Sequence, residues 1–221
     1  MPQLNVLSGG AAQGLVGELA DDFEQQTGLS IGGSFGSEMC IRDRILSQAL
    51  IDGLVQSGHA VASSVRPVGV VKTGVAVVSG QNHPKVDTRE ALQKAMSQAS
   101  AIYCPDPQKA TAGIHFYKVL TELGLPEGWQ DRLRTYSNGA TAMRALADDA
   151  VPGAIGCTQV TEILYTRGVD LIGLLPSPFE LSTVYTAAVC AQAQHPQQAQ
   201  ALIERMIAPE NAKLRKDGGF D

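Results

Sequence analysis

The first 28 residues contain an apolar run, a turn of small residues and a stripe of apolar residues at helical spacing. Residues 4–7 form the run, residues 8–10 the turn, and the stripe consists of Leu15, Leu19 and Phe23. This pattern predicts a strand, a tight glycine turn and a helix. The free N–H groups and the dipole of such a helix start favour an anion. An ordinary β–α turn has the same pattern, so the turn alone leaves both interpretations open.

The same pattern recurs three times further along the chain. Residues 88–97 predict a helix and residues 101–104 a strand. Turns of small or hydroxyl residues at 109–116, at 136–141 and, after a strand at 154–157, at 158–162 then lead into further predicted helices. Asn138 has the side chain of a helix N-cap. We therefore expect four strand-to-helix turns that end in small or hydroxyl residues.

Two long β-like runs, Val68–Val78 and Leu181–Ala191, bracket the middle of the chain. They predict an α/β protein of two lobes joined by two crossing strands, with both termini in one lobe. The expected bounds are residues 1–78 and 184–221 for the first lobe and 79–183 for the second. In open α/β sheets the ligand lies beyond the carboxyl ends of the strands, so we expect the lobes to close on it by a hinge.

Composition excludes several classes of partner. The 221 residues are 44% hydrophobic and 18% charged, and the net charge of -5 comes with no run of Lys or Arg. We therefore expect neither a nucleic acid nor a membrane surface as partner. No stretch reaches the roughly 18 apolar residues of a spanning helix, and no apolar leader precedes the first strand. This predicts either a removed signal sequence or a cytosolic protein.

The sequence contains no strong catalytic or metal-binding pattern. Its four cysteines, Cys40, Cys104, Cys157 and Cys190, are far apart and predict buried free thiols, and its four histidines are scattered, so we predict no metal and no cofactor. Residues 32–36 match the G-x-S-x-G elbow of serine hydrolases around Ser34, but this elbow follows a single β–α unit and no histidine is marked as its base. Residues 9–14 only approximate a dinucleotide fingerprint. We predict no catalytic residue and a binding protein.

Four segments, in this order and spacing, resemble the type 2 periplasmic substrate-binding proteins, most closely the molybdate-binding receptors of ABC transporters. They are the opening Leu-Asn-Val-Leu-Ser-Gly-Gly-Ala at residues 4–11, Asp106-Pro107 with Ala112-Gly113-Ile114, the turn at residues 138–142, and Gly218-Gly219-Phe220. The resemblance implies a periplasmic, monomeric receptor that captures a small oxyanion between its lobes and presents it to an ABC permease.

In that family, backbone N–H groups and hydroxyls at the strand-to-helix turns hold the oxyanion. Carried onto this chain, the resemblance implies the ligand-binding residues Ser8, Gly9, Gly10, Ala11, Thr111, Ala112, Gly113, Asn138, Gly139, Thr141, Thr158 and Gln159.

Two departures from the family pattern bear on the ligand. Ser37–Arg44 replaces a serine-rich turn and resembles translated sequencing adaptor, and Cys157-Thr158-Gln159 stands where molybdate binders tend to have a Tyr. The ligand is therefore molybdate, tungstate, sulfate or an organic carboxylate, whose second carboxyl group Arg144, His115, Thr141 or Thr161 would reach. A cytosolic sensor for such a carboxylate is the alternative function.

Overall fold

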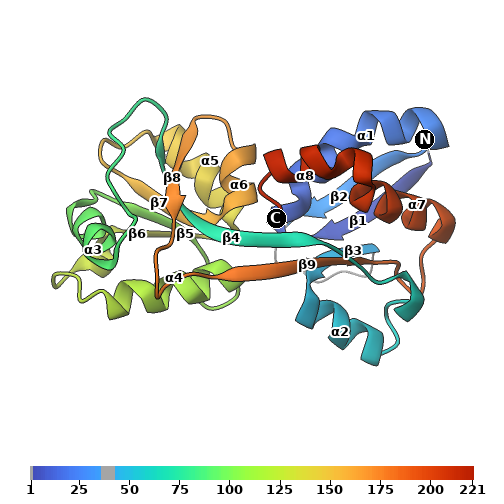
Figure 1. The fold of residues 1–221 in the computed structure, drawn as a ribbon, viewed down its shortest axis with the longest axis horizontal. Helices are drawn as coiled ribbons and strands as arrows, with labels where there is room; N and C mark the ends of the chain where they lie inside the picture. Colours follow the sequence, from blue (N-terminus) through green and yellow to red (C-terminus); the bar gives the residue numbers. More distant parts are fainter. Residues whose placement is uncertain (1, 36–42) are drawn as a thin grey trace. The chain divides into compact units, whose positions relative to one another are not determined.

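The computed structural model describes residues 2–35 and 43–221, in two units (Figure 1). Unit 1 comprises residues 1–71 and 183–221, within these described ranges, and unit 2 comprises Lys72–Ser182. Strands β4 (Arg66–Val78) and β9 (Ser182–Ala188) each run across a boundary between the units. The predicted class, two α/β lobes joined by two crossing strands, is confirmed.

The sheet of unit 1 has the strand order β2-β1-β3-β9. Strand β1 (Gln3–Ser8) is parallel to β2 (Ser30–Phe35) and to β3 (Asp43–Ser47), and β9 is antiparallel to β3. The helices of this unit are η1 (Gly10–Ala12), α1 (Gln13–Thr27), α2 (Gln48–Gln56), η2 (Ala62–Ser64), α7 (Pro196–Ile207), η4 (Pro209–Asn211) and α8 (Ala212–Asp217).

Apolar stripes at helical spacing fix the core of unit 1. Leu15, Leu19 and Phe23 of α1 are buried with Leu4 of β1 and with the apolar face of α7. Helix α2 covers the other face of this sheet, where Ile51 packs against Ala188. Phe220, near the C-terminus, is buried and meets Tyr185 edge to face.

The sheet of unit 2 has the order β8-β4-β7-β5-β6. Strands β5 (Ile102–Pro105), β6 (Leu133–Tyr136) and β7 (Ile155–Gln159) are mutually parallel, and β4 is antiparallel to β7 and to β8 (Val169–Leu174). The helices are α3 (Arg89–Gln98), α4 (Thr111–Glu122), η3 (Trp129–Arg132), α5 (Gly139–Asp149) and α6 (Val160–Tyr165).

Each face of this sheet has its own core. On one face Phe116 and Leu120 of α4 pack with Met96 of α3, and on the other Met143 and Leu146 of α5 pack with α6. The four predicted strand-to-helix turns are therefore formed, as β1 to η1 and α1, β5 to α4, β6 to α5, and β7 to α6. Residues 209–217 form two short helices, η4 and α8, and Pro209 starts the first of them.

Other predictions concern chemistry. Cys104 and Cys157 are free and buried, as predicted, and Cys190 is buried as well. Burial raises the pKa of Cys104 to about 12, so this thiol stays protonated at neutral pH. Ser34 lies within β2, where it pairs with Leu7 of β1. It therefore does not form the nucleophile elbow between a strand and a helix. In the segment Ser37–Arg44, residues 37–42, which include Cys40, lie outside the described residues, whereas Asp43 and Arg44 begin β3.

Neither a membrane-spanning helix nor a metal site was found in residues 2–35 and 43–221. None of the helices there is long and apolar enough to cross a membrane. No group of three or more His, Cys, Asp or Glu side chains in the same residues is arranged to hold a metal ion.

Candidate functional site

The carboxyl ends of three strands bring the predicted residues of unit 2 to one edge of its sheet. Because β7, β5 and β6 are parallel and adjacent in that order, their carboxyl ends meet at this edge. Helices α6, α4 and α5 start there, so Thr158 and Gln159, Thr111 to Gly113, and Asn138 to Thr141 all lie along it. The structure thus assembles the eight predicted residues of this unit at one sheet edge, where ligands of open α/β sheets bind.

The N-terminus of α4 has no side-chain cap. Its N-cap residue is Ala110, whose methyl group cannot accept a hydrogen bond, and no side chain caps it. Ala110 does have the extended backbone (φ −91°, ψ 131°) of an N-cap. The first backbone N–H groups of a helix have no partner within the helix, so those of Thr111, Ala112 and Gly113 are donors for an external acceptor.

Gly113 holds this helix start against the end of β5. A Cβ placed on Gly113 would lie 2.4 Å from the carbonyl oxygen of Pro105 and 2.3 Å from that of Asp106. Glycine is therefore required for the close approach. The Asp106 carboxylate accepts hydrogen bonds from the backbone N–H groups of Gln108 (2.7 Å) and Lys109 (3.2 Å), which fixes the loop ahead of the helix.

The N-terminus of α5, in contrast, is capped by the protein itself. Asn138 is its N-cap, as predicted, and its Oδ1 accepts a hydrogen bond of 2.9 Å from the N–H of Thr141. The backbone N–H groups of Gly139 and Ala140 lie against the carboxylate of Glu162, a residue of α6, and stabilise its charge. The first-turn donors of α5 therefore already have acceptors, in the place where the resemblance implies the ligand.

Glu162 is a buried acid that the sequence analysis missed. The residue is only 5% exposed, and its Oε2 accepts a hydrogen bond of 2.5 Å from Thr158 Oγ1. Burial raises the pKa of Glu162, and hydrogen bonds from Thr158 and from the N–H groups of Ala140, Gln159 and Gly139 oppose that rise. Its place at the third residue of α6, after the N-cap Gln159, is a helix-start pattern that could have marked it.

Two more buried hydroxyls lie in unit 2. Thr73 pairs with Gln159 across β4 and β7, and Thr161 is in the first turn of α6. Both residues are under 5% exposed, and within residues 2–35 and 43–221 neither hydroxyl has a hydrogen-bond partner. Buried hydroxyls are normally paired, so each could donate to a ligand. Thr161 was a candidate from the sequence, whereas Thr73 in a continuous β run gave no signal.

In unit 1 the predicted residues lie where β1 leads into η1 and α1. Gly9 is the N-cap of η1 and has no side chain, so the N–H groups of Gly10 and Ala11 are uncapped at this turn. A Cβ on Gly9 would lie 3.4 Å from the Tyr185 ring. The Ser8 hydroxyl is fully buried and donates to the carbonyl oxygens of Gly9 (2.7 Å) and Ile45 (3.2 Å).

Two of the side chains proposed for a second carboxyl group, those of His115 and Arg144, have protein partners. His115 Nε2 lies 2.8 Å from the carbonyl oxygen of Phe179. Arg144 is exposed and donates to Thr141 Oγ1 at 3.1 Å, as expected for a solvated helix charge.

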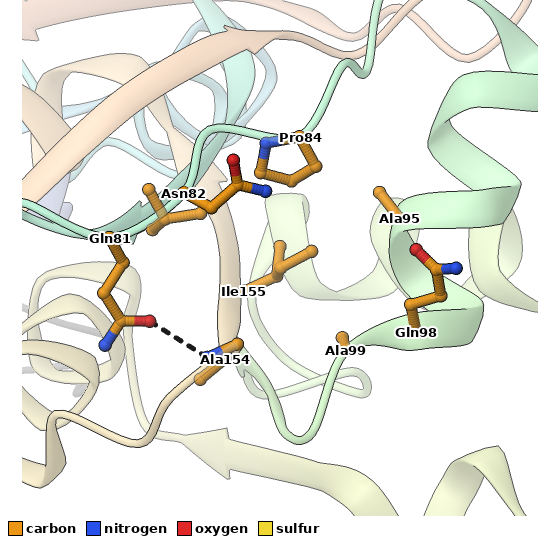
Figure 2. Close-up of a pocket in the computed structure, with 10 residues that line it drawn as sticks. Gln81, Asn82, Pro84, Ala95, Gln98, Ala99, Ala154 and Ile155 are labelled. Carbon is orange, nitrogen blue, oxygen red and sulfur yellow. Dashed lines mark hydrogen bonds between the residues drawn. The ribbon is translucent and has the colours of Figure 1, made fainter.

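A small cavity of about 140 Å³ lies at the opposite end of β7 (Figure 2). Gln81, Asn82 and Gln98 give it polar walls, and Gln81 Oε1 accepts a hydrogen bond of 2.9 Å from the N–H of Gly153. It lies beside Ile155, at the amino end of the strand, so it is separate from the edge where the helix N-termini gather.

The lobed α/β fold with helix N-termini at a sheet edge defines a class of ligand-binding proteins. The sequence profile of the bacterial extracellular solute-binding proteins matches residues 4–221. The chain therefore belongs to this family, and the predicted type 2 periplasmic-binding fold is confirmed.

Solved structures share this fold across the whole chain. The periplasmic molybdate-binding protein of Azotobacter vinelandii has a TM-score of 0.78 and 20% identity over 99% of both chains. The sulfate-binding protein SubI of Mycobacterium tuberculosis has a TM-score of 0.70 and 15% identity over 100% of this chain and 86% of SubI. A curated relative from a Pseudomonas species, named aconitate isomerase, is 24% identical over 98% of this chain and 87% of its own length.

Proposed function

We propose that the protein is a monomeric periplasmic receptor that binds a small tetrahedral oxyanion, molybdate, tungstate or sulfate, without transforming it, and delivers it to an ABC permease. Family membership supports the receptor role. Structural neighbours named for molybdate and sulfate support the choice of anion.

The uncapped N-terminus of α4 is the observation that carries this proposal. A helix start without a side-chain cap offers converging N–H donors and a partial positive charge, which suit an anion. A charge-assisted hydrogen bond contributes about 1.5–3 kcal/mol and micromolar affinity needs about 8 kcal/mol, so four to six donors suffice. Thr111, Ala112 and Gly113 would supply three.

The remaining donors in this proposal differ in availability. Gly10 and Ala11 lie at an uncapped turn, whereas the N–H of Gly9 and the hydroxyl of Ser8 already donate to carbonyl oxygens, and the N–H of Gly139 faces the Glu162 carboxylate. The Asn138 side chain accepts a hydrogen bond from the N–H of Thr141, and the Thr141 hydroxyl accepts one from Arg144. We therefore expect α4 and the turn at residues 9–11 to contribute more binding energy than the start of α5.

The second candidate ligand is an organic carboxylate. The relative named aconitate isomerase covers nearly the whole chain, and aconitate is a tricarboxylate. The buried hydroxyls of Thr73 and Thr161 could donate to such a ligand. A sensor for a carboxylate in the cytosol is the corresponding alternative function.

Isothermal titration with molybdate, tungstate, sulfate and cis- and trans-aconitate tests the proposal. We expect micromolar or tighter binding of at least one tetrahedral anion and weaker binding of aconitate. NMR of protein incubated with cis-aconitate should show no conversion. Tighter binding of aconitate would favour the second candidate, and its isomerisation would refute the receptor role.

A further inference from the structure

Glu162 brings a negative charge to the edge where an anionic ligand is expected. Its Oε2 accepts a hydrogen bond of 2.5 Å from Thr158 Oγ1, and the backbone N–H groups of Ala140, Gln159 and Gly139 also stabilise its negative charge. A Cβ on Gly139 would lie 2.0 Å from Oε2 of Glu162, so the acid packs directly on the helix start. The α5 N-terminus thus holds an internal anion, while the neighbouring α4 N-terminus has no cap.

We propose that Glu162 is a specificity-determining residue, whose carboxylate occupies the start of α5 and thereby disfavours ligands in proportion to their negative charge. This inference rests on the proposed function, because it assumes an anion at the same sheet edge. It goes beyond that function because it assigns to Glu162 a preference, among tetrahedral anions of one shape, for those that carry less charge.

The physical reason is the charge dependence of Coulomb repulsion. A fixed negative charge acts on a bound anion with an energy proportional to that anion's charge, and burial weakens the screening by water. Burial raises the pKa of Glu162, whereas the hydrogen bond from Thr158 and the nearby backbone N–H groups favour its ionised form. Removing the carboxylate should therefore change the free energy of binding twice as much for a dianion as for a monoanion.

Glu162 also has a purely structural interpretation. Its bond from the N–H of Gln159 is half of a capping box at the start of α6, and such a cap orders the helix whatever the ligand. Loss of a cap would distort the site and change the affinities for two ions of equal shape by the same factor. The ratio of the two affinities therefore separates charge from structure.

Tungstate and perrhenate form the appropriate pair, because both are tetrahedral oxyanions of similar size with two charges and one charge. Their dissociation constants are measured by isothermal titration at neutral pH for the wild type, E162Q and E162A. We expect E162Q to strengthen tungstate binding about tenfold and perrhenate binding about threefold, so that the first factor is the square of the second.

The matched control is E122Q. Glu122 is exposed and ends α4, roughly 18 Å along the helix from its uncapped start, so this variant has the same net charge as E162Q. We expect E122Q to change neither affinity by more than about 1.5-fold. An equal change in both affinities with E162Q and E162A would refute the inference and leave Glu162 as a cap.

A measurement on the wild type decides the question if neither variant folds. Sulfate and perchlorate keep two charges and one charge as the pH falls below 7, so protonation of Glu162 should strengthen sulfate binding more than perchlorate binding. The groups that contact this carboxylate, Thr158, Gly139, Ala140 and Gln159, do not titrate. A constant ratio of the two affinities would refute the inference.

Charged residues also lie on the elements packed against α6. One of them is Arg144 on α5. On β8, hydrogen bonds from Ser79 and His83 hold the pKa of Asp170 below its usual value. The other two are Asp148 and Asp149, at the far end of α5. If the wild type and both charge-removing variants bind no tetrahedral anion at all, the proposed function itself fails.

Discussion

Giving α4 a cap of its own is the most direct test of its role in binding. The substitution Ala110→Asp places a carboxylate on a residue that already has the extended backbone of an N-cap. An Asp at this position accepts a hydrogen bond from the second or third N–H of the helix, here Ala112 or Gly113. The new side chain would thus take the donors that we assign to the ligand.

The expected effects on stability and on affinity have opposite signs. An N-cap stabilises a helix by about 0.5–2 kcal/mol relative to alanine, and for a chain of this size about 1 kcal/mol corresponds to about 2–4 °C in Tm. Loss of one charge-assisted hydrogen bond weakens anion binding by about 1.5–3 kcal/mol, which is about 10- to 100-fold in Kd. We therefore expect a protein that melts higher and binds its anion at least tenfold more weakly.

Differential scanning fluorimetry without ligand and isothermal titration with the best-bound anion measure the two effects. Ala110→Ser caps the same N–H groups without adding charge, so it separates competition for donors from repulsion. We expect A110S to weaken binding less than A110D and to raise Tm similarly. If both variants melt higher and bind the anion as tightly as the wild type, the α4 N-terminus is not part of the site.

Three further predictions concern the packing around Glu162. Gly139→Ala should destabilise the protein by more than about 2 kcal/mol, because the added Cβ would lie 1.9 Å from Thr158 Oγ1. The control Gly53→Ala in α2, whose added Cβ meets nothing within 4 Å, should stabilise the protein by about 0.5–1 kcal/mol. Urea unfolding measures both changes, and equal effects would contradict this packing. Thr158→Val should cost about 1.5–3 kcal/mol by removing a donor to a buried carboxylate, and an unchanged urea midpoint would contradict the 2.5 Å hydrogen bond. Burial raises the pKa of Glu162 above its unfolded value of 4.5, so its contribution to folding is most favourable below pH 4.5 and is lost as the pH rises through the folded pKa. As the pH falls through this range, the unfolding free energy of the wild type should therefore increase relative to that of E162Q. A constant difference between the two would show that the folded pKa is not raised.

Local sequence determined the order of the elements and the position of each turn. The spacing of Leu15, Leu19 and Phe23 predicts the buried stripe of α1, and the Asn138 side chain predicts the N-cap of α5. These features depend on residues a few positions apart, so their physical cause is visible in a short window of sequence. The four strand-to-helix turns were predictable for the same reason.

Only the tertiary structure decided which helix starts have free donors. The resemblance implies ligand donors at both Gly139 and Gly113, yet the helix start at Gly139 is closed by Asn138 and Glu162, and the one at Gly113 has no cap. Glu162 lies 23 residues after Gly139, and its carboxylate reaches the start of α5 only because β7 and α6 pack beside that helix. A contact between residues so far apart has no local pattern, because it depends on how strands pair and on which face each helix covers.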